Sequence, residues 1–358
     1  MPQSHERAPD DLVTGFLGSF APMAASPVST TRYRRRTILG GMLALLTGFV
    51  PGSTTKADTP EESHVLDTAW PAITSAEMPE RCQISGVALD SDGNVLALGR
   101  GENHWMPGRS FKQQKIRKPT VLVVDPNDGT LRKAWGENLF VMPHQIVIGP
   151  GGDTWVVDTG QQRVFRFDAH GRKVASIGGP SVRFNMPTDI AFLGDGSFVV
   201  SDGYLNSRIV KFTADGKPMA AWGSKGTGPL EFQTPHSVTV DDRDRIYVAD
   251  RENSRVQILT PDGKFISAWQ NVDRPITVRF AAGNVFVLSN LEADRGIVRR
   301  FDTDGRLLES FHTKPPGDHG DFEWPHGLAV SADGDDVYVG FTLTGRRVQR
   351  YRRLKPSG

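Results

Sequence analysis

The sequence predicts an all-β protein, a six-bladed β-propeller of repeated units with four short strands each. Three observations lead to this fold class. An apolar strand, a turn and a second strand recur six times, starting near Ser85, Pro143, Pro187, Pro235, Pro275 and Pro325. The other half of the unit is a strand, usually with an arginine, then an Asp-Gly or similar hairpin turn and an outer strand. No stretch has the periodicity of a long amphipathic helix.

The second half of the unit can be followed along the chain, and its outer strand often ends in Trp-Gly. Its copies are "PTVLVVDPNDGTLRKAWG" (119–136), "DTGQQRVFRFDAHGRKVASIG" (158–178), "DGYLNSRIVKFTADGKPMAAWG" (202–223), "DRENSRVQILTPDGKFISAWQ" (250–270), "LEADRGIVRRFDTDGRLLESF" (291–311) and "LTGRRVQRYRR" (343–353). The last copy stops before an outer strand. Because "VLDTAWP" (65–71) resembles "KPMAAWG", we expect it to supply that strand and close the ring.

Composition narrows the function classes. The 42 basic and 41 acidic residues nearly cancel, so no strong field favours nucleic acid or a charged membrane surface. Cys82 is the single cysteine, which excludes an intrachain disulfide and a cysteine metal cluster.

Residues 1–57 differ from the rest and are predicted to be an export signal and leader, with the propeller occupying residues 58–358. A basic cluster precedes the apolar run 38–50, which is short for a membrane span but typical of a signal-peptide core. "RRTIL" (35–39) resembles a twin-arginine signal, and a cleavage site is expected after Ala57. We therefore expect a periplasmic or secreted protein with no stable membrane span after cleavage. An ordinary Sec signal or an uncleaved anchor is the alternative.

Histidines occupy one repeat position in every second unit. The occupants of that position, at the start of each inner strand, are Ser85, His144, Thr188, His236, Ile276 and His326. In a closed ring of six blades, alternate blades lie about 120° apart, so the three imidazoles should converge near the axis. Three histidine nitrogens with a fourth position open are the ligands of a catalytic zinc, although other divalent metals also accept imidazole. A single such histidine would more often be structural.

Three further residues are candidates for the same site. Arg100 ends a strand in "VLALGRGENHW", where an inward guanidinium needs an anionic partner. Tyr204 lies in the turn "SDGYLNSR" and Arg251 lies in the corresponding turn of the next unit. Ring packing for the tyrosine and bracing of adjacent blades for the arginine are the structural alternatives.

Taken together, these residues resemble the peptidyl-α-hydroxyglycine α-amidating lyase family, a group of propellers with NHL-type repeats. The matching stretches are "GVALDSDGNVLALGRGENHW", "NLFVMPHQI", "PTDIAF", "VSDGYLNSRIVKF", "GPLEFQTPHSV", "VADRENSRVQ" and "WPHGLAV", in order from residue 86 to residue 330. The resemblance implies a six-bladed propeller whose zinc is held by His144, His236 and His326.

The resemblance also implies roles for other residues. Arg100 and Tyr204 match the catalytic arginine and tyrosine of the family, and Arg251 matches a second active-site arginine. A structural calcium would be held by the backbone carbonyls of Val87 and Ile146 and by an aspartate, but the aspartate position is Gly327 here, which argues against calcium.

The implied reaction cleaves the C–N bond of a peptidyl-α-hydroxyglycine, giving a peptide amide and glyoxylate. The expected partner is a small molecule or peptide with an α-hydroxyglycine-like end, or a related carbinolamide or ureido acid. Two alternatives remain at this level. One is a non-catalytic propeller that binds a protein or ligand and carries a structural metal. The other is a different metal-dependent lyase or hydrolase on the same scaffold.

Overall fold

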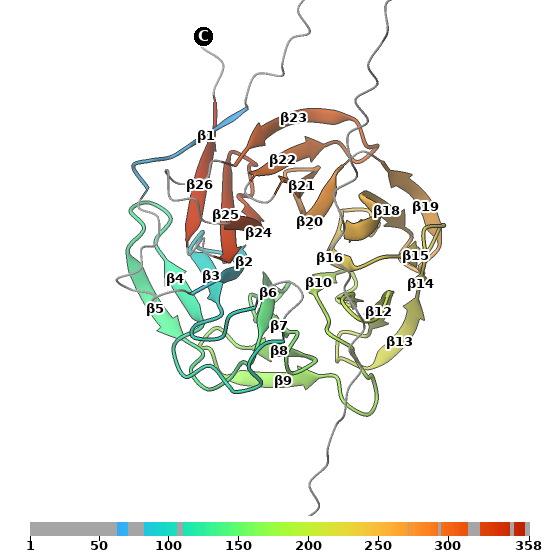
Figure 1. Cartoon of the computed structure of the whole chain (residues 1–358), viewed down its shortest axis with the longest axis horizontal. Coiled ribbons are helices and arrows are strands. Elements are labelled where there is room, and N and C mark those ends of the chain that lie inside the picture. Colours follow the sequence, from blue (N-terminus) through green and yellow to red (C-terminus); the bar gives the residue numbers. More distant parts are fainter. Residues whose placement is uncertain are drawn as a thin grey trace, which may run out of the picture. The chain divides into compact units, whose positions relative to one another are not determined.

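The computed structural model describes residues 63–70, 82–105, 110–270, 272–292, 295–313, 323–343 and 347–354. These segments contain six four-stranded antiparallel sheets arranged as blades around a central axis (Figure 1), which confirms the predicted all-β propeller. The predicted export signal, residues 1–57, lies outside the described residues and stays a prediction. The described part of the chain contains no helix with the length and apolar character needed to cross a bilayer.

In blades 1 to 5 the strands follow one another outward from the axis in chain order, whereas the outermost strand of blade 6 is β1. Blade 1 holds β2 (Ile84–Leu89), β3 (Val95–Gly99), β4 (Val121–Val124) and β5 (Leu131–Trp135); blade 2 holds β6 (Pro143–Ile148), β7 (Thr154–Asp158), β8 (Arg163–Phe167) and β9 (Lys173–Ile177); blade 3 holds β10 (Asp189–Phe192), β11 (Phe198–Asp202), β12 (Arg208–Phe212) and β13 (Pro218–Trp222).

Blade 4 holds β16 (Pro235–Val240), β17 (Ile246–Asp250), β18 (Arg255–Leu259) and β19 (Phe265–Trp269); blade 5 holds β20 (Arg274–Ala281), β21 (Asn284–Glu292), β22 (Arg295–Phe301) and β23 (Leu307–His312); blade 6 holds β24 (Glu323–Val330), β25 (Asp336–Leu343), β26 (Val348–Arg353) and β1 (His64–Leu66). A short parallel pair, β14 (Ser224–Lys225) and β15 (Glu231–Phe232), lies between blades 3 and 4 in the chain, and Arg251–Asn253 form a 3-10 turn, η1.

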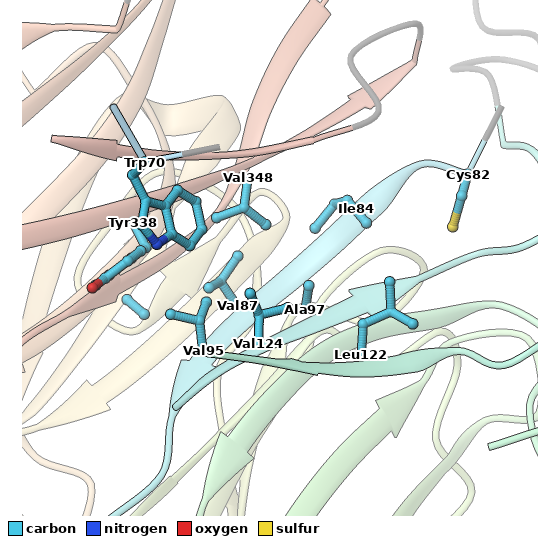
Figure 2. Close-up of a cluster of buried hydrophobic side chains, with 11 residues drawn as sticks. Trp70, Cys82, Ile84, Val87, Val95, Ala97, Leu122, Val124, Tyr338 and Val348 are labelled. Carbon is cyan, nitrogen blue, oxygen red and sulfur yellow. The ribbon is translucent and has the colours of Figure 1, made fainter. Parts of the chain in front are cut away.

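The blades are held together by apolar side chains at every interface between neighbours. Side chains alternate along a strand, so Val95 and Ala97 of β3 pack toward blade 6 while Leu96 and Leu98 pack toward blade 2. Both faces of the middle strands are therefore buried, as their unbroken apolar runs require. Figure 2 shows the cluster between blades 6 and 1, where Val348 and Tyr338 face strands of blade 1.

The ring is closed by the N-terminal segment, as predicted. Strand β1 pairs antiparallel with β26, matching Val65 with Arg352 and Leu66 with Tyr351. The strand is shorter than the predicted segment, because the chain leaves the sheet after Leu66 and Trp70 packs edge-on against Tyr338 at 5.6 Å.

The closure also depends on an ion pair between Asp67 and Arg350, 2.6 Å apart, whose side chains are 11% and 5% exposed. We expect Asp67→Ala to lower the free energy of unfolding by about 3 kcal/mol, since it leaves a buried guanidinium without its partner. Asp335→Ala, which removes an exposed pair with Arg353, should cost less than about 1 kcal/mol. Equilibrium denaturation of the two variants tests this, and equal losses would contradict it.

The same ion pair predicts how closure depends on pH. Burial raises the pKa of Asp67, but hydrogen bonds from Arg350 and two backbone amides outweigh burial, so the net pKa in the folded protein is lowered. The stabilisation is therefore fully present above the unfolded pKa, about 3.9, and is lost as the pH falls through the lower folded value.

Candidate metal centre

The repeat position that carries the histidines lies at a distortion of the inner strands. In five blades the pairing between the inner strand and its neighbour shifts register at this residue, and in blade 3 the residue lies directly before β10. A bulge leaves one residue unpaired and re-aims its side chain. The occupants can therefore turn toward the axis, whereas a regular strand would point them at a neighbouring blade.

His144, His236 and His326 meet at the axis, as the spacing predicts. Their rings lie 4.7 to 5.1 Å apart between centroids, and one ring nitrogen from each falls in a cluster whose atoms lie within 4.8 Å of one another. The first two are fully buried and His326 is 6% exposed. The three imidazoles form a compact set of nitrogen ligands in a site largely closed to bulk solvent.

The blades between the histidines hold these rings in place. The Nδ1 atoms of His144, His236 and His326 hydrogen-bond to backbone carbonyls at 2.6, 2.8 and 2.6 Å. The three acceptors belong to the residues at the same repeat position one blade further on, namely Thr188, Ile276 and Ser85. A carbonyl can only accept, so each Nδ1 carries the proton and each Nε2 presents a lone pair. Such an outer hydrogen bond orients a metal-binding imidazole.

The environment keeps the three imidazoles neutral. Burial lowers the pKa of His144 and His236 well below the ordinary value, and it lowers that of His326 to about 3. Nearby positive charge adds to the effect, from Arg100 at His144 and His326 and from Arg251 at His236. Neutral imidazole is the form that binds a metal.

Tyr204, in the turn after β11, completes the cluster. Its hydroxyl lies 2.9 Å from Nε2 of His144 and 2.9 Å from Nε2 of His236. Both nitrogens are acceptors, but a hydroxyl has a single proton and can donate to one of them at a time. The cluster thus has more lone pairs than protons, which is the donor chemistry of a cation site. Three converging imidazole nitrogens fit zinc or another divalent metal that prefers nitrogen.

Two arginines reach the same region from opposite sides of the ring. Arg100 follows β3 of blade 1 and Arg251 follows β17 of blade 4, at the same place in the repeat. Arg100 is 3% exposed, and burial lowers its pKa to about 10. Its Nη2 atom is buried with no hydrogen-bond partner among the described residues. A guanidinium in this state is a ready site for an anion.

Arg251 lies against Tyr204, with its Cζ 5.6 Å from the centre of the phenol ring. Burial raises the pKa of Tyr204, while the charges of Arg251 and Arg100 lower it, and the net effect is a raised value. The Nε of Arg251 also donates to Glu252 at 2.8 Å, and Glu252 in turn accepts from Arg274. The predicted site residues therefore come together, with the two arginines flanking the tyrosine and the histidines.

The described residues do not fit the calcium that the resemblance implies. Gly327 offers no carboxylate, and a Cβ there would lie 3.0 Å from backbone atoms of Gly86 and Val87, so a side chain requires the backbone to move. Asp189 occupies in blade 3 the repeat position that Gly327 occupies in blade 6, but its carboxylate is already bonded to Ser237 and Arg279.

Sequence reasoning missed the residues that support Arg100 and Tyr204. Gln83 hydrogen-bonds to Arg100, and Trp105 packs edge-on against Tyr204 with ring centres 4.7 Å apart. Trp105 lies in a segment specific to blade 1, and Gln83 occupies a repeat position where the other units carry different residue types. The proximity of Trp105 to Arg100 in "GRGENHW" was the one available signal.

Comparisons with known proteins relate this chain to NHL-repeat proteins and to amidating lyases. An NHL-repeat model matches residues 232–259. The chain is 34% identical to the rat peptidylglycine alpha-amidating monooxygenase over 318 residues, which is 77% of this chain but about a third (32%) of that protein's length. It is 30% identical over 311 residues to the peptidyl-alpha-hydroxyglycine alpha-amidating lyase 2 of Drosophila melanogaster, covering 80% of this chain and 74% of the relative.

Among solved structures, a streptogramin B lyase superposes with a TM-score of 0.53 at 16% identity, covering 80% of this chain and all of that one, and supports the fold alone. Fold and site together define the class of this protein: it is an NHL-repeat propeller with a buried three-histidine centre. Its relatives include proteins named as lyases. More specifically, the chain belongs to the peptidyl-α-hydroxyglycine α-amidating lyase family.

Proposed function

We propose that this protein is a metal-dependent carbon–nitrogen lyase that converts a peptidyl-α-hydroxyglycine, or a related carbinolamide, to an amide and glyoxylate. The observation that carries the proposal is the place of the Tyr204 hydroxyl, 2.9 Å from two of the three histidine Nε2 atoms. A purely structural metal would need neither this hydroxyl nor the nearby Arg100, whose Nη2 has no partner among the described residues. Family membership points to the same chemistry.

Arg100 is proposed to bind the carboxylate of the substrate. Two of its nitrogens are held by Pro143 and Gln83, so Nη2 is the end left to donate to an incoming anion. The site excludes most water, and a hydrogen bond to a charged group is strong there. The α-hydroxyl then falls on the side of Tyr204 and the histidines.

Tyr204 is proposed to be the base that removes the proton of the α-hydroxyl. As that O–H bond breaks, its electrons form the C=O bond of glyoxylate and the C–N bond breaks. The leaving amide nitrogen takes up the proton that Tyr204 removed, which returns the base to its starting form. Burial opposes ionisation of the phenol in the free protein. Arg251, beside the ring, favours the anionic form and is placed to stabilise it.

His144, His236 and His326 would hold the metal through Nε2, with their Nδ1 hydrogen bonds fixing the direction of each lone pair. When bound, the metal would supply a Lewis acid that makes both the phenol and the substrate hydroxyl easier to deprotonate.

The direct test is to incubate the purified protein with α-hydroxyhippurate and to measure glyoxylate and benzamide. We expect equal amounts of the two products, loss of turnover after removal of the metal by a chelator, and recovery after addition of zinc. A protein that carries its metal but releases no glyoxylate would favour the binding-propeller alternative.

A further inference from the structure

Gln83 is a buried residue directly before β2 that connects two parts of the site. Its side-chain carbonyl Oε1 accepts hydrogen bonds from Arg100 Nη1 at 3.0 Å and from the backbone nitrogen of Trp105 at 3.3 Å. Its Nε2 donates to the backbone carbonyl of Trp105 at 3.2 Å. Gln83 is 1% exposed, and its bond to Arg100 is buried, while its two bonds to Trp105 are partly buried. The Gln83 side-chain amide therefore bonds both to the Arg100 guanidinium and to the backbone of Trp105.

These bonds determine which edge of Arg100 is available. Arg100 also donates from Nε to the carbonyl of Pro143, at 3.2 Å, and Pro143 directly precedes the candidate metal ligand His144. A planar guanidinium held at Nε and Nη1 cannot rotate, and Nη2 is left buried without a partner in the described structure. Leaving a buried donor unpaired is costly, so an unrestrained arginine would turn to satisfy it.

The hydrogen bonds of Gln83 to the Trp105 backbone also fix the position of the Trp105 ring beside Tyr204 and Arg100. The Trp105 ring lies edge-on to Tyr204, with centres 4.7 Å apart, and its centre is 5.6 Å from Cζ of Arg100. The Trp105 segment is anchored from its other side by Asn103, whose Nδ2 donates to the carbonyls of Gln114 and Val141. Arg100, Trp105 and Tyr204 thus form one contact chain, and Gln83 is hydrogen-bonded to two of its three members.

We propose that Gln83 is the positioning residue of the substrate site: it locks the Arg100 guanidinium so that Nη2 faces the substrate carboxylate, and it holds Trp105 against Tyr204. The inference rests on the proposed function insofar as the carboxylate is that of an α-hydroxyglycine. The substrate carboxylate is bound both before and during the reaction, so loss of the Gln83 hydrogen bonds acts mainly on substrate binding.

The test uses the metal-loaded protein and two variants with a matched control. Gln83→Met keeps the length of the side chain and removes its hydrogen bonds, whereas Gln83→Glu still accepts from Arg100 but cancels its charge. Gln349→Met alters another buried glutamine, which accepts a hydrogen bond from Tyr351 and lies in β26, the third strand of blade 6 counted from the axis. The readouts are KM and kcat with α-hydroxyhippurate, the Kd of hippurate, which lacks the hydroxyl, and metal content.

For Gln83→Met we expect KM and the Kd of hippurate to rise about 10- to 100-fold, with kcat changed much less and metal content unchanged. Gln83→Glu should fold normally and weaken hippurate binding at least as much as Gln83→Met does. Gln349→Met should match the wild type in both constants. Unchanged KM and Kd in both Gln83 variants would overturn the inference, as would wild-type protein that does not bind hippurate. If hippurate binding depended on Gln83 but the wild type showed no turnover, the proposed lyase activity would be refuted and the positioning role of Gln83 would still be supported.

Discussion

Tyr204→Phe is expected to lower the turnover of an α-hydroxyglycine substrate by about 10²–10⁴-fold, the usual contribution of a positioned proton transfer. The substitution removes one oxygen and keeps the ring, so the edge-on contact with Trp105 and the packing against Arg251 should persist. The histidines keep their Nδ1 hydrogen bonds, and the metal should remain bound. KM should change little, because Arg100 still binds the carboxylate. Steady-state kinetics with α-hydroxyhippurate and metal analysis of the same preparation measure the effect.

Tyr247→Phe is the matched control for this variant. Tyr247 is also buried, and its hydroxyl donates to Asp241 at 3.0 Å in blade 4, away from the histidines. Its loss should reduce stability while leaving the turnover of the folded protein intact. If a folded, metal-loaded Tyr204→Phe protein turned over substrate at the wild-type rate, another group would have to be the base.

His236→Ala is expected to lose the metal and, with it, all measurable lyase activity. The two remaining histidines cannot hold the metal as three ligands do. Removal of this imidazole also removes a hydrogen-bond partner of the Tyr204 hydroxyl. The propeller should stay folded, since its blades are held by apolar clusters at the interfaces. Metal content, circular dichroism and glyoxylate release measured on one sample separate these effects.

The control here is His170→Ala, because His170 is exposed in the turn between β8 and β9, outside the histidine cluster. It should retain full metal content and activity. Full metal occupancy in His236→Ala would mean that the ion binds elsewhere, and loss of the fold would mean that the site is needed for structure.

The blade pattern and the three histidines could be predicted because their signals are local and repeated. Apolar alternation and glycine turns define each hairpin without reference to the rest of the chain. Once six units are recognised, ring symmetry brings every second unit to the same axis, so the positions of His144, His236 and His326 follow from spacing. The family resemblance helps to identify Arg100 and Tyr204, but no sequence signal predicts their contacts with the cluster.

Thus the sequence by itself determined the number of blades, the alternation of the histidines and the N-terminal closure of the ring. Only the tertiary structure decided how the imidazoles are aimed, because their Nδ1 partners are backbone carbonyls of the next blade, such as Ser85 for His326, 241 residues away. Only the tertiary structure likewise shows the hydrogen bond from Arg100 to Gln83 and the close approach of Gly327 to Gly86 across the closing interface. The contacts of His326 with Ser85 and of Gly327 with Gly86 exist only after the ring has closed, and single hydrogen bonds or backbone approaches of this kind leave no periodic signal in a sequence.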